Sequence, residues 1–257
     1  MSEYYKPKRT KNLYDPDSPE PFKVSRTKIE LFINCPRCFY LDRRRGVGRP
    51  PGFPFNLNSA VDKLLKKEFD QYREKNEPHP LILQNDIDAV PHQIETLNTW
   101  RSNRIGVQHH HVPTNLLIFG AIDDLWINSA KEMIVVDYKA TSKKEKIDRL
   151  NDTWHITYKR QMEIYQWLIA NNGYTVSKTG YFVYCNGITD KEEFNSFLEF
   201  DVNVIPYEGN SFWVENTIMN LHECLNADDI PSCKDGCDYC SYRDAANDVI
   251  LNNQGPQ

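Results

Sequence analysis

The sequence predicts one α/β domain, because runs typical of strands alternate with runs typical of helices. Two apolar, β-rich runs, 116–119 and 134–136, each lead towards an acidic residue. Residues 155–170 have the pattern of a helix, and 176–185 and 194–204 are typical of further strands. A chain of 257 residues is long enough to bury a substantial core.

The N-terminal part is expected to begin with a flexible leader at 1–22, where prolines lie among charged residues without apolar periodicity. Ser25 is placed to cap a short helix, and Pro36 suits the first turn of the next helix. A loop rich in proline follows at 49–55. Residues 58–73 then carry the apolar spacing of an amphipathic helix.

The middle and the end of the chain give weaker patterns. Prolines interrupt 77–90 and leave it ambiguous, whereas 92–100 is predicted as a helix. The three histidines at 109–111 lie just before a proline and lack helical spacing, so we expect a solvated loop rather than a metal site. Residues 211–225 are expected to form a closing helix.

Two carboxylates mark the candidate site. A turn at 128–131 would make the apolar runs a hairpin and bring Asp123 close to Asp137, where like charges need a cation such as Mg²⁺ or Mn²⁺. Lys139 shares a strand face with Asp137, so its ammonium could position water or stabilise charge on a phosphate. Alone, this D-x-K triplet also fits a solvated ion pair. Asp124 points to the opposite face and is expected to be structural.

A glutamine and a tyrosine lie one helical turn apart in the predicted helix 155–170. Gln161 would be costly to bury without a polar partner, which favours a role in the site. Tyr165 alone could equally be a residue of the core.

In this order the motifs resemble those of the PD-(D/E)XK nuclease superfamily, and within it the RecB-type nucleases and the related CRISPR-adaptation exonucleases. Asp123 corresponds to the first acidic metal ligand of the family, and Asp137 with Lys139 to its (D/E)-x-K element. Gln161 and Tyr165 correspond to its Q-x-x-x-Y helix. The resemblance covers roughly residues 25–245, including an opening Cys-Pro-Arg segment and a cysteine-rich close.

The resemblance implies a restriction-endonuclease-like mixed sheet flanked by helices, with a cysteine-stapled terminus, in a domain at 23–246 followed by a tail at 247–257. It implies Mg²⁺- or Mn²⁺-dependent hydrolysis of DNA, acting as an exonuclease, and a helicase or CRISPR-adaptation partner. The Tyr138 carbonyl is a further candidate metal ligand. Asp62 stands where relatives often carry a histidine, and it could ligate the metal or simply be a polar residue of an amphipathic helix.

The cysteines depart from the family pattern, because the position expected for the last cluster ligand is Ala246. The resemblance implies a 4Fe-4S cluster, but two C-x-x-C pairs also fit a tetrahedral zinc. Five cysteines compete for four places, and the fourth ligand could be Cys38 or Cys233. The candidates are Cys35, Cys38, Cys233, Cys237 and Cys240.

Composition limits the possible functions. The formal net charge of −5 excludes a general nucleic-acid coat, so DNA contacts must come from local basic patches at 43–45, 63–67, 143–146 and 159–160. No apolar run is long enough for a membrane span, and the first residues do not resemble a signal peptide, so we expect a cytoplasmic protein. Two alternatives stay open: a non-catalytic iron-sulfur or zinc DNA-binding module, and a zinc-stabilised interaction protein.

Overall fold

The structure, a computed structural model, describes residues 8–52 and 55–253. They form two compact units. The first contains the described residues of Met1–Phe53, His110–Leu117 and Glu215–Gln257, and the second contains those of Pro54–His109 and Ile118–Val214.

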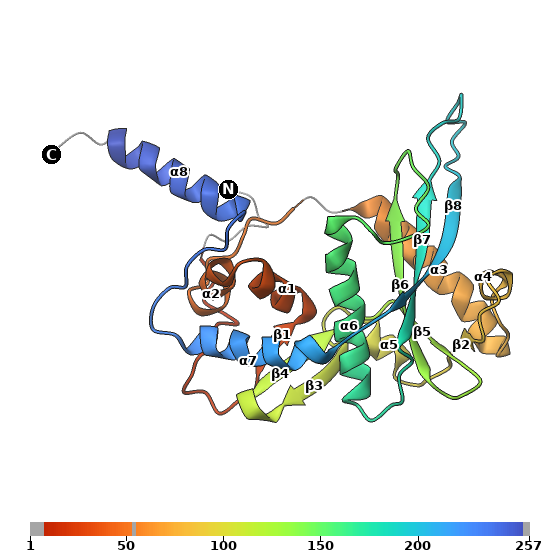
Figure 1. The fold of residues 1–257 in the computed structure, drawn as a ribbon, viewed down its shortest axis with the longest axis horizontal. Helices are drawn as coiled ribbons and strands as arrows, with labels where there is room; N and C mark the ends of the chain where they lie inside the picture. The colour runs from red at the N-terminus through yellow and green to blue at the C-terminus, as the bar shows by residue number, and fades with distance from the viewer. Residues whose placement is uncertain (1–7, 53–54, 254–257) are drawn as a thin grey trace. The chain divides into compact units, whose positions relative to one another are not determined.

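Both helices and strands occur throughout the described chain, as the sequence predicts for an α/β protein (Figure 1). In chain order, the elements are β1 (Phe22–Ser25), α1 (Arg26–Asn34), α2 (Pro36–Arg44), α3 (Asn56–Lys75), α4 (Pro80–Gln84), β2 (Val90–Pro91), α5 (Leu97–Trp100), β3 (Val107–His111), η1 (Val112–Thr114), β4 (Leu116–Gly120), β5 (Asp124–Ile127), β6 (Met133–Thr141), η2 (Thr153–His155), α6 (Ile156–Ala170), β7 (Thr179–Gly187), β8 (Phe200–Glu208), α7 (Phe212–Asn226) and α8 (Asp238–Asn253).

The main sheet is mixed and has the strand order β2-β5-β6-β7-β8. Strand β5 pairs antiparallel with β6, β6 pairs parallel with β7, and β7 pairs antiparallel with β8. Helix α6 connects the two parallel strands, because parallel neighbours need a crossover rather than a tight turn. A second sheet has the order β1-β4-β3. The prediction of a mixed sheet flanked by helices is confirmed.

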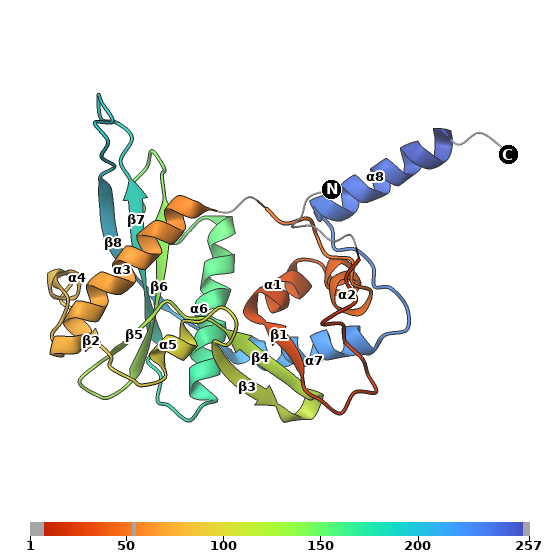
Figure 2. The same ribbon diagram turned by 180° about the vertical axis from the view of Figure 1, so that it is seen from behind.

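Helices α3 and α6 cover opposite faces of the main sheet (Figures 1 and 2). Val136 and Tyr138 of β6 pack in one core with Leu65 and Phe69 of α3. The intervening residue Asp137 instead meets α6, because side chains alternate between the two faces of a strand. The sheet therefore presents apolar residues of β6 to α3 and the Asp137 carboxylate to α6.

Several elements lie where the sequence predicts them. Pro36 begins α2, and Ser25 precedes α1, although its side chain makes no capping hydrogen bond. The turn after β5 follows the prediction for 128–131, with the Asn128 backbone N–H donating to the Glu132 carbonyl at 3.2 Å. Lys131 has a φ of 64° there.

Other predictions are corrected. Asp123 does not end a strand, because β4 stops at Gly120 and Asp123 directly precedes β5. The predicted hairpin between the runs 116–119 and 134–136 is wrong, because β4 belongs to the second sheet and the strand that pairs with β6 across the turn is β5. The predicted loop at 109–111 belongs to β3, where His111 is buried against Glu215. Strand β8 begins at Phe200, not at 194, since the β7–β8 connection is longer than expected.

The ends of the chain contain more contacts and more helix than the sequence indicates. Residues 1–7 of the expected leader lie outside the described part of the chain, and further along Arg9 pairs with Asp42 of α2 at 2.6 Å. At the other end, α8 extends to Asn253, past the start of the expected tail at 247. Within the described ranges, no helix combines the length and the apolar character needed to cross a membrane.

Candidate active site and cysteine cluster

The candidate active site begins on β6, where Asp137 and Lys139 face α6. The Asp137 carboxylate is fully buried and forms an ion pair with the Lys139 ammonium, whose side chain is 14% exposed. Burial alone would lower the pKa of Lys139, but the charges of Asp137 and Asp123 raise it above its ordinary value. Lys139 is therefore a stable cation at this position.

Gln161 of α6 joins these residues in one hydrogen-bonded chain. Its amide N donates to Asp137 Oδ1 at 2.6 Å, and its Oε1 accepts from Lys139 Nζ at 3.4 Å. The amide N also lies 3.2 Å from the hydroxyl oxygen of Tyr165, one helical turn later. The polar partners that the sequence requires for a buried Gln161 are thus present, and four predicted site residues lie together.

A second group of charges lies between α3 and the start of β5. Lys66 Nζ lies 2.7 Å from Asp62 Oδ1 and 3.1 Å from Asp123 Oδ1. The other Asp123 oxygen accepts from the Tyr138 backbone N–H at 3.0 Å. Burial alone would raise the pKa of Asp123, but Lys66, Lys139 and the Tyr138 amide hold it below its ordinary value. Asp123 is therefore an ionised carboxylate, with one oxygen held by Lys66 and the other by the Tyr138 backbone N–H.

Behind Asp123 lies a buried ionic network that fixes its backbone. Arg101 Nε donates to the Asp123 carbonyl at 2.9 Å, and its Nη2 lies 2.9 Å from Asp124 Oδ1. Asp124 is fully buried, also pairs with Arg73 and accepts from the Tyr138 hydroxyl at 2.6 Å. Burial and the Asp124 charge together raise the pKa of Tyr138 well above its ordinary value. These contacts agree with the expectation that Asp124 points to the opposite face of the strand and has a structural role.

This network gives a prediction for stability. Asp124→Asn removes the charge shared by the buried guanidinium groups of Arg73 and Arg101, so we expect the free energy of unfolding to fall by about 3–5 kcal/mol. Urea denaturation measures this change. The control is Asp148→Asn, because the Asp148 side chain is 61% exposed and forms an ion pair with its exposed neighbour Arg149. Equal stability of the two variants would contradict the prediction.

Three contributing residues are not identified as site residues by sequence reasoning. In the sequence, Lys66 is noted only as part of the basic patch 63–67, although its position four residues after Asp62 places both on one helix face. Arg101 has no local pattern that marks it. The Tyr158 ring lies 4.5 Å from Lys139 Nζ, and it lines a cavity of about 110 Å³ together with Asp62 and Lys139.

The acidic residues offer hard oxygen ligands, which suit Mg²⁺ or Mn²⁺. In this structure the neighbouring cations are the ammonium groups of Lys66 and Lys139. Asp62, Asp123 and Asp137 do not form a set with all ligand atoms within 4.8 Å of one another among the described residues. The donor chemistry fits a divalent cation, and binding would require at least Lys66 to move away from its carboxylates.

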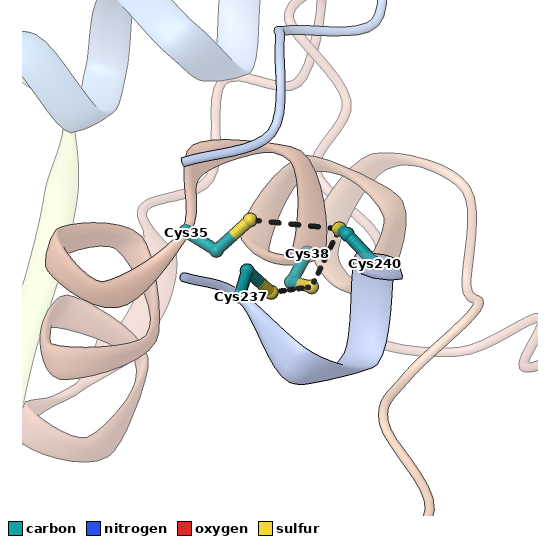
Figure 3. Close-up of side chains that lie close together, drawn as sticks. All are labelled: Cys35, Cys38, Cys237 and Cys240. Atoms are coloured by element: carbon teal, nitrogen blue, oxygen red, sulfur yellow. Dashed lines mark hydrogen bonds between the residues drawn. The ribbon is translucent and has the colours of Figure 1, made fainter. Parts of the chain in front are cut away.

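Four cysteines form a separate cluster, built from the beginnings of α2 and α8 (Figure 3). The ligand atoms of this set, Cys35, Cys38, Cys237 and Cys240, all lie within 4.8 Å of one another. Sγ of Cys240 lies 3.8 Å from that of Cys35 and 3.7 Å from that of Cys38, which lies 3.7 Å from that of Cys237. Cys233 packs beside the cluster but lies outside the set, so the structure selects Cys38 as the fourth member.

The surroundings of Cys35 favour a thiolate, whereas burial raises the pKa values of Cys38 and Cys240. Burial alone would raise the pKa of Cys35, but the backbone N–H groups of Lys234 and Cys38 help to lower it to about 6. Arg49 Nη2 lies 3.4 Å from Cys237 Sγ. Positive charge and amide donors stabilise the ionised form, which is the form that binds metals. The site therefore fits a metal ion or cluster.

The comparison with protein families agrees with this arrangement. The family model of the PD-(D/E)XK nuclease superfamily matches residues 55–245, about three quarters of the chain. No curated protein matches the chain. The matched range includes both acidic residues, the lysine and the Gln/Tyr helix. The chain belongs to the PD-(D/E)XK nuclease superfamily, a group of metal-dependent nucleases.

Proposed function

We propose that this protein hydrolyses phosphodiester bonds of DNA in a reaction that depends on Mg²⁺ or Mn²⁺. The observation that carries the proposal is the hydrogen-bonded chain in which Gln161 contacts both Asp137 and Lys139. These hydrogen bonds connect an anionic metal ligand, Asp137, to a stable cation, Lys139, on one face of β6. Exonuclease activity is supported by the resemblance to RecB-type and CRISPR-adaptation exonucleases.

Asp123 and Asp137 would hold the metal, with Asp62 and the Tyr138 carbonyl as further oxygen ligands. A bound divalent ion would supply Lewis acidity and lower the pKa of a coordinated water. Lys66 neutralises Asp62 and Asp123 in this structure and would give up that role when the ion binds. Arg101 and the Tyr138 amide keep Asp123 in place independently of the ion.

Lys139 would position the attacking water or stabilise the negative charge that develops on the phosphate. Gln161 holds the Lys139 ammonium and the Asp137 carboxylate in a fixed relation, and its amide faces the reacting groups. Tyr165 is buried and supports Gln161 through its hydroxyl group. This division of roles makes Lys139 the principal catalytic side chain.

End-labelled linear DNA tests the proposal. Single-stranded and duplex forms are incubated with and without Mn²⁺, beside a circular single strand of the same composition. We expect Mn²⁺-dependent shortening of linear DNA and an intact circle. Cleavage of the circle would show internal cutting, whereas binding without cleavage would favour a non-catalytic DNA-binding module. A helicase or CRISPR-adaptation partner and a cytoplasmic location belong to this proposal as well.

Asp137→Asn should weaken Mn²⁺ binding together with cleavage. The variant keeps the shape of the side chain but removes one of the two principal anionic ligands and the ion pair with Lys139. We expect Mn²⁺ affinity to fall by about tenfold or more, which is the range seen when groups that support a metal site are changed. Isothermal titration calorimetry measures it. The same Mn²⁺ affinity in wild type and variant would remove Asp137 from the ligand set.

We also propose that the four-cysteine cluster binds zinc rather than the 4Fe-4S cluster of related nucleases. Four thiolates at about 2.3 Å from one tetrahedral zinc lie about 3.8 Å apart. The Sγ–Sγ distances of 3.7 and 3.8 Å correspond to this spacing. In a 4Fe-4S cluster each thiolate binds a different iron, which holds the sulfurs farther apart. Arg49 would offset part of the negative charge of such a centre.

A further inference from the structure

An exposed aromatic side chain lies close to the candidate active site. Trp154 of η2 is 38% exposed although large aromatic residues are usually well buried. Its indole N–H donates to Asp152 Oδ2 at 2.9 Å. This hydrogen bond satisfies the polar atom and limits rotation of the ring. Trp154 is therefore a partly exposed ring with a defined orientation.

A lysine accompanies the ring. Lys143 Nζ lies 4.1 Å from the centroid of the Trp154 ring and 3.5 Å from Asp152 Oδ2, and its side chain is 41% exposed. Its backbone is fixed, because its N–H donates to Asn186 Oδ1 at 2.7 Å and its carbonyl accepts from Asn186 Nδ2 at 2.9 Å. The exposed ammonium can thus exchange its weak local contacts for a phosphate while its backbone stays in place.

His155 offers a buried donor beside the same ring. The centroids of its ring and the Trp154 ring are 3.7 Å apart. Its Nδ1 accepts from the Asp152 backbone N–H at 3.1 Å, and burial lowers its pKa, so the proton of the neutral ring lies on Nε2. Nε2 is buried and has no hydrogen-bond partner among the described residues. A buried donor of this kind is costly unless a ligand or water satisfies it.

One aromatic ring connects this group to the catalytic lysine. The Trp154 and Tyr158 rings meet edge to face with centroids 5.3 Å apart. The Lys139 ammonium lies over the Tyr158 ring, 4.5 Å from its centroid. A nucleotide held at Trp154 would therefore be a close neighbour of a phosphate that reacts at Lys139.

We propose that Trp154, Lys143 and His155 form a subsite for one unpaired nucleotide, so that the substrate is single-stranded DNA or a frayed DNA end. The base stacks on Trp154, Lys143 binds a phosphate, and His155 Nε2 donates a hydrogen bond to the nucleotide. The inference rests on the proposed nuclease function and specifies the strandedness of its substrate. An unpaired base is required, because bases within a duplex stack on one another and do not expose their faces to a protein ring.

Binding of fluorescent oligonucleotides tests the subsite without cleavage. Fluorescence anisotropy is measured for a short single strand and for the matching duplex, without added Mg²⁺ or Mn²⁺ and without chelator. Trp154→Ala should weaken single-strand binding by about five- to 150-fold, which corresponds to the loss of one stacked base. Trp154→Phe should retain most of the affinity. Duplex binding should change much less than single-strand binding.

Phe194→Ala is the matched control. Phe194 is 73% exposed in the β7–β8 connection, where the neighbouring charges are mostly acidic and the one nearby lysine in the sequence, Lys191, pairs with Glu199 at 2.9 Å. It therefore offers an aromatic ring among acidic residues. Its removal should leave both affinities unchanged. Thermal melting of each variant verifies folding.

The outcomes separate the subsite from the nuclease function. Unchanged single-strand affinity in Trp154→Ala, or an equal loss for duplex and single strand, would overturn the subsite. If wild type fails to cleave DNA but the Trp154 variants behave as expected, the subsite stands and the nuclease proposal fails. If wild type cleaves DNA and Trp154→Ala binds single strands as tightly as wild type, the nuclease proposal stands and the subsite fails.

Discussion

Lys139→Ala is expected to lower the rate of DNA cleavage by about 10²- to 10⁴-fold, the range that positioned proton-transfer groups and charge-stabilising groups contribute. Lys139 is 14% exposed and is held by Asp137 and Gln161, so solvent cannot replace its ammonium in the same position. Single-turnover cleavage of end-labelled DNA in Mn²⁺ measures the chemical step without product release. A rate equal to that of wild type would exclude Lys139 from catalysis.

The same substitution affects the folded protein, because it leaves the buried Asp137 carboxylate without its ammonium partner. We expect a loss of stability in metal-free protein, which Mn²⁺ restores by neutralising the carboxylate. The increase in melting temperature on adding Mn²⁺ should thus be larger for Lys139→Ala than for wild type. Lys178→Ala is the control, since Lys178 is exposed and lies outside the predicted basic patches. This control should leave cleavage and melting unchanged.

Cys35→Ser is expected to remove most of the bound metal and to lower the melting temperature strongly. A structural zinc contributes about 10–16 kcal/mol of apparent binding free energy at neutral pH, and this energy is coupled to folding. Cys35 begins the first C-x-x-C pair and lies in a cluster that joins the start of α2 to the start of α8. Metal analysis of wild type should give about one zinc per chain and colourless protein.

Cys233→Ser is the matched control, because Cys233 neighbours the cluster but lies outside the four-cysteine set. It should keep the zinc and the melting temperature of wild type, whereas Cys38→Ser should behave like Cys35→Ser. A zinc chelator should lower the melting temperature of wild type and of Cys233→Ser, but not that of Cys35→Ser or Cys38→Ser, which already lack the metal. Brown protein with about four irons per chain would instead support a 4Fe-4S cluster. Protein without either metal would show that the thiols are unliganded.

The sequence alone determines the parts of the site that follow local periodicity. Strand alternation places Asp137 and Lys139 on one face of β6 and Tyr138 on the other, and the structure has this arrangement. Helical spacing places Gln161 and Tyr165 on one face of α6 in the same way. The α/β fold was predictable because these patterns repeat every two residues in a strand and about every 3.6 in a helix. The family was recognised from the resemblance of the ordered motifs to those of known nucleases.

Tertiary structure alone decides which distant residues meet. Two residues, Cys38 and Cys233, are equally plausible by spacing, and only packing of α2 beside the start of α8 selects Cys38. His111 has the local sequence of a loop residue, yet it forms part of β3, which pairs with β4, and its ring contacts Glu215 more than a hundred residues later. Likewise, Arg101 fixes the Asp123 carbonyl although no motif marks it. Contacts between residues far apart in the chain leave no periodic pattern, because they depend on how the elements pack and not on the local order of side chains.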